Sequence, residues 1–170
     1  ATMDQIFYFQ NYATVIDVIR KSDLNEKWLI FRSNKKRAYE LRKNIGEDAY
    51  LISADNKDDE ILAELIRAER FHCRVLVSTK LLDNGINIKD LHLKHVLIDT
   101  ISKTEFLQML GRKRRVNADD QFTLYLPQKS IRIFQGYLTP EMQEIYKLLT
   151  IEIQTGEICR RVIKERKFCD

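Results

Sequence analysis

The sequence predicts a three-layer α/β domain, in which helices cover both faces of a mostly parallel β-sheet. Short apolar runs alternate with amphipathic runs along most of the chain, and this alternation is typical of parallel strands buried on both faces. The 170 residues are 44% hydrophobic, which is enough for one domain with a sizeable core. Only five glycines and two prolines interrupt the chain, so we expect most of it to be regular structure.

The first half of the chain predicts three strands and three helices. The strands are compact apolar segments at residues 4–9, 27–32 and 49–54. The helices are amphipathic segments at residues 12–22, 35–45 and 56–71. Ser33 and Asn34 are expected to cap the second helix and Gly46 to stop it. Acidic residues in the first turn of the third helix suit the helix dipole.

The second half predicts three further strands, at residues 73–79, 94–100 and 121–127. A helix is expected at residues 102–110, with Gly111 close to its end. Thr139 and Pro140 then open an amphipathic tail that reads as two helical segments. We therefore predict a domain at residues 1–127 and a helical extension at 128–170 that packs on it or on a missing domain.

The connections that follow the strands are the predicted site. Right-handed crossovers bring them to one edge of a parallel sheet, and open sheets bind ligands at that edge. The loops concerned are Arg32–Asn34, Ser53–Asn56, Ser78–Asn87 and Asp99–Lys103.

The chain has no nucleotide-binding motif of its own. No glycine is followed by lysine, so there is no P-loop, and no GxGxxG occurs. Asp55 and Asp99 each follow an apolar strand and could mimic a metal-holding carboxylate, although a strand-end cap is the simpler interpretation. No nucleophile lies beside a suitable base, so a self-contained hydrolase is not indicated.

Other classes of site have little support. His92 and His95 lack partner ligands nearby, and we expect ordinary strand-flanking histidines and no metal site. Three widely spaced cysteines suggest a reducing compartment. No membrane span or signal peptide is apparent, which predicts a cytoplasmic protein. The net charge of +4 permits an anionic partner without demanding one.

The stretch QMLGRKRR places Gln108, Arg112 and Arg115 at helical spacing. If the helix continues past Gly111, these three side chains lie on roughly one side. Paired arginines suit phosphate, because a guanidinium is always charged and offers a planar fork of donors. Lys113 and Arg114 would then point elsewhere and take no part. The alternatives are a solvated helix end and a nuclear-localisation signal.

Three segments together resemble the second RecA-like domain of superfamily-two helicases of the DEAD/DEAH type, the helicase conserved C-terminal domain. KWLIFRSN resembles motif IV, VLVSTKLLDNGINIKD resembles motif V, and QMLGRKRR resembles motif VI. Their order and spacing also match the family. The resemblance covers about residues 27–127, with weaker support at 4–22, and it implies a three-layer RecA-like fold.

The resemblance implies a nucleotide site shared with a first RecA-like domain. Arg112 and Arg115 match the motif VI arginines that reach the triphosphate, one of them as an arginine finger. The implied ATP-binding residues are Gln108, Gly85 and Asn87. Two positions depart from the family pattern, because Asn87 stands where many members have aspartate and Arg114 replaces a small residue. ATP and Mg²⁺ are expected to be held mainly by a domain outside this chain.

The resemblance also implies contacts with the backbone of DNA or RNA. The residues at the matching positions are Ser33, Asn34, Ser53, Ser78, Thr79 and Lys80. Contacts of this kind give grip without reading sequence.

The predicted function is the C-terminal motor domain of an ATP-dependent nucleic-acid helicase or translocase. Its expected partners are an N-terminal RecA-like ATP-binding domain in the same polypeptide and a DNA or RNA backbone, with no membrane. The isolated chain is expected to show no meaningful ATPase activity. The alternatives are a stand-alone nucleic-acid or protein interaction module on a helicase-derived fold and, less well supported, a nucleotide-binding regulatory domain.

Overall fold

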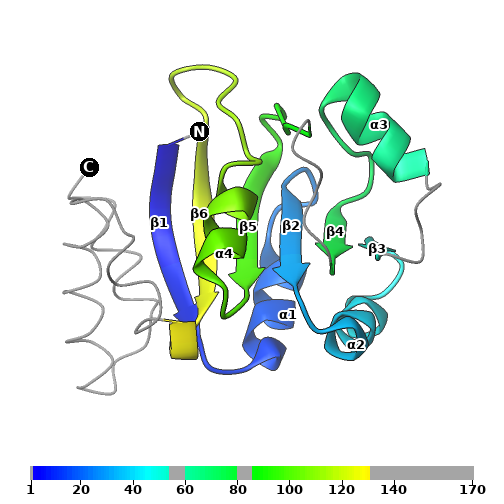
Figure 1. The fold of residues 1–170 in the computed structure, drawn as a ribbon, viewed down its shortest axis with the longest axis vertical. Coiled ribbons are helices and arrows are strands. Elements are labelled where there is room, and N and C mark those ends of the chain that lie inside the picture. Colours follow the sequence, from blue (N-terminus) through cyan, green and yellow to red (C-terminus); the bar gives the residue numbers. More distant parts are fainter. Residues whose placement is uncertain (1, 54–59, 80–85, 131–170) are drawn as a thin grey trace.

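A computed structural model describes residues 2–53, 60–79 and 86–130 of the chain (Figure 1). The predicted tail helices, Asp55, Lys80 and Gly85 lie outside these described residues. Among the described residues, no helix is long and apolar enough to cross a membrane.

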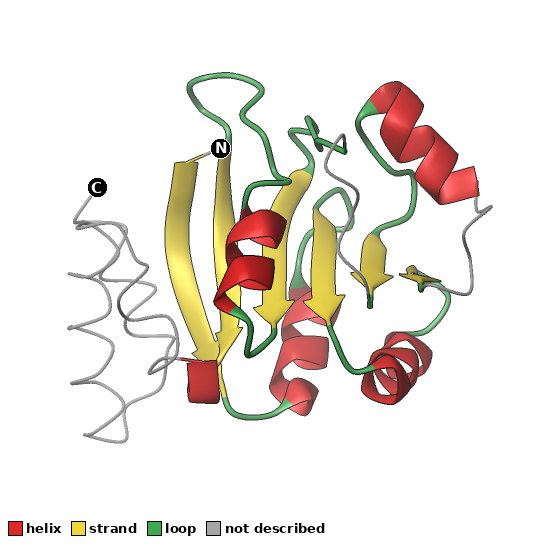
Figure 2. Cartoon of the chain, viewed as in Figure 1, coloured by secondary structure: helices red, strands yellow, loops and turns green. Residues whose placement is uncertain are grey.

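The described residues form one six-stranded sheet with helices on both faces, which confirms the predicted RecA-like α/β class. The strands are β1 (Thr2–Phe9), β2 (Lys27–Arg32), β3 (Ala49–Ile52), β4 (Val75–Ser78), β5 (Leu93–Asp99) and β6 (Gln121–Pro127). Their order in the sheet is β1-β6-β5-β2-β4-β3. Every strand pair is parallel, as the common direction of the arrows in Figure 2 shows.

Four α-helices and one short 3-10 turn complete the described fold. The helices are α1 (Tyr12–Lys21), α2 (Lys35–Ile45), α3 (Glu60–Ala68) and α4 (Lys103–Leu110), and the turn η1 covers Gln128–Ser130. The core side chains of α1 and α2 pack on one face of the sheet, and those of α3 and α4 pack on the other.

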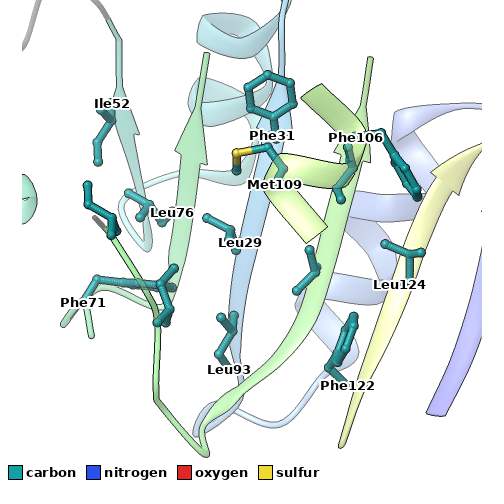
Figure 3. Packing of buried hydrophobic residues seen from close by; sticks show 14 of the residues in the cluster. Leu29, Phe31, Ile52, Phe71, Leu76, Leu93, Phe106, Met109, Phe122 and Leu124 are labelled. Carbon is teal, nitrogen blue, oxygen red and sulfur yellow. The ribbon is translucent and has the colours of Figure 1, made fainter. Parts of the chain in front are cut away.

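The alternation of side chains along β2 supplies both halves of the core. Leu29 and Phe31 belong to the cluster beneath α3 and α4, whereas Trp28 and Ile30 belong to the cluster beneath α1 and α2. Figure 3 shows Phe106 and Met109 of α4 beside the strand residues of the first cluster. All six side chains have at most 1% of their surface exposed, so the apolar runs are strands because both of their faces are covered.

Side-chain caps define where the helices begin, and backbone geometry defines where they end. Asn34 accepts a hydrogen bond from the Arg37 amide at 3.0 Å and caps α2, as predicted. Gly46 ends that helix with a φ of 104°, a left-handed conformation that favours glycine. The predicted helix 56–71 ends earlier, at Ala68, because Glu69 adopts a left-handed φ of 55°.

The helix α4 does not continue past Gly111. Ser102 caps its start, and the Gly111 amide bonds to the Leu107 carbonyl at its end. The chain then leaves the helix, and Lys113 forms a parallel β-bridge with Ile88. The helix predicted at residues 102–110, with Gly111 close to its end, is confirmed. The condition under which Gln108, Arg112 and Arg115 would share a helix face is not met, since a backbone pairing with Ile88 replaces the next helical turn.

Candidate functional site

The predicted site residues within the described part of the chain fall into two groups. One group lies at the carboxyl edge of the sheet and contains Ser33, Asn34, Ser53, Ser78 and Thr79. The other group lies at the end of α4 and beside it, and contains Gln108, Arg112, Arg115 and Asn87.

Backbone hydrogen bonds fix the edge loops relative to one another. The Thr79 amide donates to the Ile52 carbonyl at 3.0 Å, and the Ser33 amide donates to the Asp99 carbonyl at 3.4 Å. These bonds continue the β3–β4 and β2–β5 ladders one residue past the strand ends. The loops after four strands are therefore held in register at one edge, as parallel topology predicts.

The side chains of the edge group differ in what they offer to a ligand. Ser33 and Asn34 are exposed, although Asn34 also caps α2. Thr79 is half-buried, and Ser53 has 7% of its surface exposed. Ser78 has none exposed, so its hydroxyl has no surface available for a direct nucleic-acid contact in this structure.

A hollow of about 560 Å³ lies beside the edge group. It is lined by Lys35, Lys36, Tyr39, Arg42, Tyr50, Leu51, Ser53 and Thr79. The four α2 residues of this set were not among the predicted site residues. The sequence does contain a signal for a basic surface here, because the three cations Lys35, Lys36 and Arg37 directly follow the loop after β2.

A second hollow of about 330 Å³ surrounds Asp99 at the ends of β1, β2, β5 and β6. The Asp99 carboxylate accepts a hydrogen bond from the Tyr12 hydroxyl and pairs with Arg32 at 3.5 Å and Lys129 at 3.4 Å. The Arg32 guanidinium also lies 3.6 Å from the centre of the Tyr12 ring. Burial, reinforced by the Asp99 charge, raises the pKa of the Tyr12 hydroxyl well above its ordinary value. Asp99 thus has strand-end partners, and the described residues contain no cluster of metal ligands.

The four consecutive cations after Gly111 have four different environments. Arg112 is buried, and its guanidinium contacts the Ile86 carbonyl at 3.4 Å. Arg115 is exposed, and its guanidinium donates to the carbonyls of Asn117 at 2.9 Å and Ala118 at 3.3 Å. Of the two arginines that are predicted to reach a phosphate, Arg115 is therefore the exposed one.

Lys113 and Arg114 each contact another part of the described chain, and the expectation that they take no part in phosphate binding stays a prediction. Lys113 is buried, and its ammonium pairs with the Asp120 carboxylate. Arg114 is exposed, and its Nε donates to the Asn87 side-chain oxygen at 3.0 Å. Helical phase could not predict these contacts, because the helix ends before either residue.

The segment after β4 is joined to the arginine loop through the backbone. The Ile88 amide donates to the Arg112 carbonyl at 2.8 Å, and the Arg114 amide donates to the Ile88 carbonyl at 2.9 Å. Within the described residues, the segment that begins at Ile86 is therefore held against the arginine loop by two backbone hydrogen bonds.

Two largely buried ion pairs stabilise the arginine loop and the segment that is paired with it. Asp120 accepts hydrogen bonds from Lys113 and from the Val116 amide. Asp90 accepts from Lys27 at 2.7 Å. Burial alone would raise the pKa of both carboxyls, but these hydrogen bonds and the lysine charges outweigh it and lower each pKa below its ordinary value.

Comparison with known proteins connects this geometry to a family. The sequence profile of the family described as the helicase conserved C-terminal domain matches residues 10–117. No curated protein sequence matches the chain.

Several solved structures share the fold. The C-terminal domain of Saccharomyces cerevisiae Dbp5, bound to Gle1 and IP6, is 16% identical with a TM-score of 0.57, covering 96% of this chain and 99% of that one. The Escherichia coli DEAD-box protein SrmB, bound to the regulator of ribonuclease activity A, is 16% identical with a TM-score of 0.61, covering 82% and 87%. At such identities the likeness concerns the fold alone.

Proposed function

Because the chain belongs to the helicase conserved C-terminal domain family, we propose that it is the C-terminal motor domain of an ATP-dependent nucleic-acid helicase or translocase. In this proposal Arg115 and Arg112 contact the phosphates of a nucleotide that lies between this domain and a first RecA-like domain. The carboxyl edge of the sheet, at Ser33, Asn34, Ser53 and Thr79, grips a DNA or RNA backbone. Membership of the family is the premise, and the roles of these residues are the proposal.

The backbone pairing between Ile88 and the arginine loop is the observation that carries the proposal. A helicase must link the occupancy of its nucleotide site to its grip on nucleic acid. Here Ile88, which follows Thr79 by nine residues in the sequence, is hydrogen-bonded to the backbone of Arg112 and Arg114. This pairing supports the proposal, because a shift of Ile88 would move the arginine loop with it.

In the proposed reaction this chain stabilises the negative charge that develops during phosphoryl transfer. Phosphoryl transfer depends mainly on positioning and on neutralising charge that develops on the phosphate. Arg115 supports this role because it is exposed and its guanidinium is oriented by two backbone carbonyls. The sequence has no Gly-Lys pair, so the proposal assigns ATP and Mg²⁺ mainly to the first domain, where they supply the leaving group and its electrostatic activation.

Arg112 requires a more careful test than Arg115. Its side chain is only 7% exposed and lies against the Ile86 carbonyl. Replacing it with alanine would confound catalysis with stability, whereas Arg112→Lys preserves a cation. A motor role requires that Arg112 gain access to the nucleotide when the two domains close.

The isolated chain separates this proposal from a self-contained ATPase. We expect residues 1–170 to bind a single-stranded oligonucleotide in a salt-dependent way, because backbone phosphates release counterions. We also expect no ATP turnover above a buffer blank. Robust hydrolysis by the pure chain would contradict the division of the nucleotide site between two domains.

A protein-interaction module is the second candidate. One observation favours it. The similar structure of Dbp5 contains bound Gle1, and that of SrmB contains the bound regulator of ribonuclease activity A. A complete protein whose ATPase activity is unaffected by loss of Arg115 would support this candidate over the motor domain.

A further inference from the structure

We propose that the hollow between α2 and the end of β3 binds a nucleobase of a single-stranded nucleic acid, with the Tyr39 ring as its stacking surface. This inference rests on the proposed function and deepens it, because backbone grip alone requires no aromatic side chain. The contact adds a base-dependent component to binding at the carboxyl edge of the sheet.

Tyr39 is placed for contact with a ligand and not for packing in the core. Its side chain is 61% exposed and lies on the α2 wall of the hollow. Among the described residues, every other exposed large hydrophobic side chain is aliphatic: Leu24, Ile66, Leu91, Ile101, Leu107 and Val116. A tyrosine ring offers a large flat surface at a low entropic cost, because only two side-chain torsions are fixed on binding.

The charge at the start of α2 points to an anionic ligand. Its first turn carries Lys35 and Lys36 and has no acidic residue. Cations at a helix N-terminus oppose the helix dipole. The helices α3 and α4 instead have Glu60 and Glu105 in their first turns, and the first turn of α1 has no acidic residue. A bound phosphate would offset this local cost, and departures from a local rule of this kind are expected at functional sites.

The face of α2 that lines the hollow alternates charge with the aromatic ring. Lys35 and Lys36 precede Tyr39 by one turn, and Arg42 follows it by one turn, so all four side chains share a face. The Arg42 Nε donates to the Ala49 carbonyl at 3.1 Å, which fixes the orientation of its guanidinium. A positively charged groove with an aromatic surface is how single-stranded nucleic acids are held without sequence readout.

The remaining walls suit a base attached to a backbone. Leu51 and Tyr50 of β3 supply apolar surface, and Ser53 and Thr79 supply hydroxyls at the sheet edge. The volume of about 560 Å³ falls in the range of small-molecule sites. A strand whose backbone passes Thr79 would therefore have a base within the same hollow that contains Tyr39.

The test compares normal and abasic oligonucleotides of equal length. Fluorescence anisotropy at fixed salt would measure the affinity of residues 1–170 for labelled oligothymidylate or oligouridylate and for an abasic strand. We expect the normal strand to bind more tightly. Tyr39→Ala should weaken that binding by at least about fivefold and leave abasic binding unchanged, whereas Tyr39→Phe should retain wild-type affinity.

Two controls exclude indirect effects. Ile66→Ala truncates an exposed apolar side chain on α3 and should change neither affinity. Lys36→Ala should weaken normal and abasic strands alike and reduce the salt dependence, because it removes a backbone contact.

The outcomes separate the inference from the proposed function. If wild-type protein binds normal and abasic strands equally, or if Tyr39→Ala weakens both equally, base stacking is overturned while salt-dependent backbone binding stands. If no strand binds, nucleic-acid binding by this chain and the base site are both overturned.

Discussion

The Lys113 ammonium lies 2.9 and 2.7 Å from the two carboxylate oxygens of Asp120, and neither side chain has any exposed surface. Lys113 also donates to the Asp90 carbonyl, and Asp120 accepts from the Val116 amide. The loop that contains Arg114 and Arg115 is therefore closed at both ends by one buried ion pair. Helical spacing gave Lys113 no role, yet its ion pair anchors the loop that contains Arg115, the proposed catalytic arginine.

Removing the lysine should destabilise the domain strongly. Lys113→Met would leave Asp120 buried without its hydrogen-bonded cation, with only Lys94 at 3.9 Å, and breaking a buried pair costs about 3–5 kcal/mol. Urea unfolding of residues 1–170 would measure the loss. Lys89→Met is the matched control, because its pair with Glu69 is largely exposed, and it should cost less than about 1 kcal/mol. Equal losses in the two variants would contradict a structural role for the buried pair.

The buried carboxylates predict a loss of stability in acid. The pKa of Asp120 in the folded protein lies below its ordinary 3.8, because hydrogen bonds from Lys113 and Val116 outweigh burial. The unfolded state therefore takes up a proton first, and stability falls as the pH drops below about 4. Asp120→Asn should start from a lower stability at pH 5 and lose less of it by pH 3 than wild type does. A parallel decline would show that Asp120 does not contribute.

His95 predicts a second pH dependence at higher pH. Its ring stacks on Trp28 with centroids 4.1 Å apart, and burial lowers the pKa of the imidazole below 6.5 despite the nearby Glu26. As the pH falls below about 6.5, the unfolded state is protonated first and stability is lost. His95→Gln should flatten the stability profile between pH 7 and 5. Identical profiles for wild type and His95→Gln would refute this.

Asn87 and Arg114 are the two positions that depart from the family pattern, and they are hydrogen-bonded to each other. The Arg114 Nε donates to the Asn87 side chain at 3.0 Å. We expect each of Asn87→Ala and Arg114→Ala to slow ATP hydrolysis by the complete protein by about threefold, since each releases the same contact beside Arg115. The double variant should lose no more than the larger single loss, as coupled residues do. Losses that multiply would show that the two side chains act independently.

The sequence was sufficient for the architecture, because the signals for it are local. Apolar runs identified all six strands within a few residues, and Asn34 and Gly46 marked the ends of α2 where the structure has them. The parallel sheet then brought Ser33 and Thr79 to one edge without further information.

The arginine loop could not be predicted to the same depth, because its contacts are made outside regular helices and strands and several of them are long-range. Lys113 pairs with Asp120 across a loop and donates a hydrogen bond to the Asp90 carbonyl in a different segment. Arg114 donates a hydrogen bond to Asn87, which lies in the segment bridged to the arginine loop. Asp90 and Asn87 lie 23 and 27 residues from their partners, and the seven-residue spacing of Lys113 and Asp120 carries no information where the chain is not helical. The hollow beside Tyr39 was missed for a similar reason, since it forms only when α2 packs beside β3.

The ATPase rate of the complete protein with Arg115→Ala, measured with saturating single-stranded nucleic acid, tests the central claim most directly. The matched control is Arg70→Ala, which removes an exposed arginine from the α3–β4 connection. We predict that Arg115→Ala lowers kcat by about a thousandfold or more, with nucleotide and nucleic-acid affinity close to wild type, while Arg70→Ala hydrolyses ATP normally. A kcat for Arg115→Ala equal to that of the control would contradict the assignment of this chain as the arginine-supplying half of a helicase ATPase.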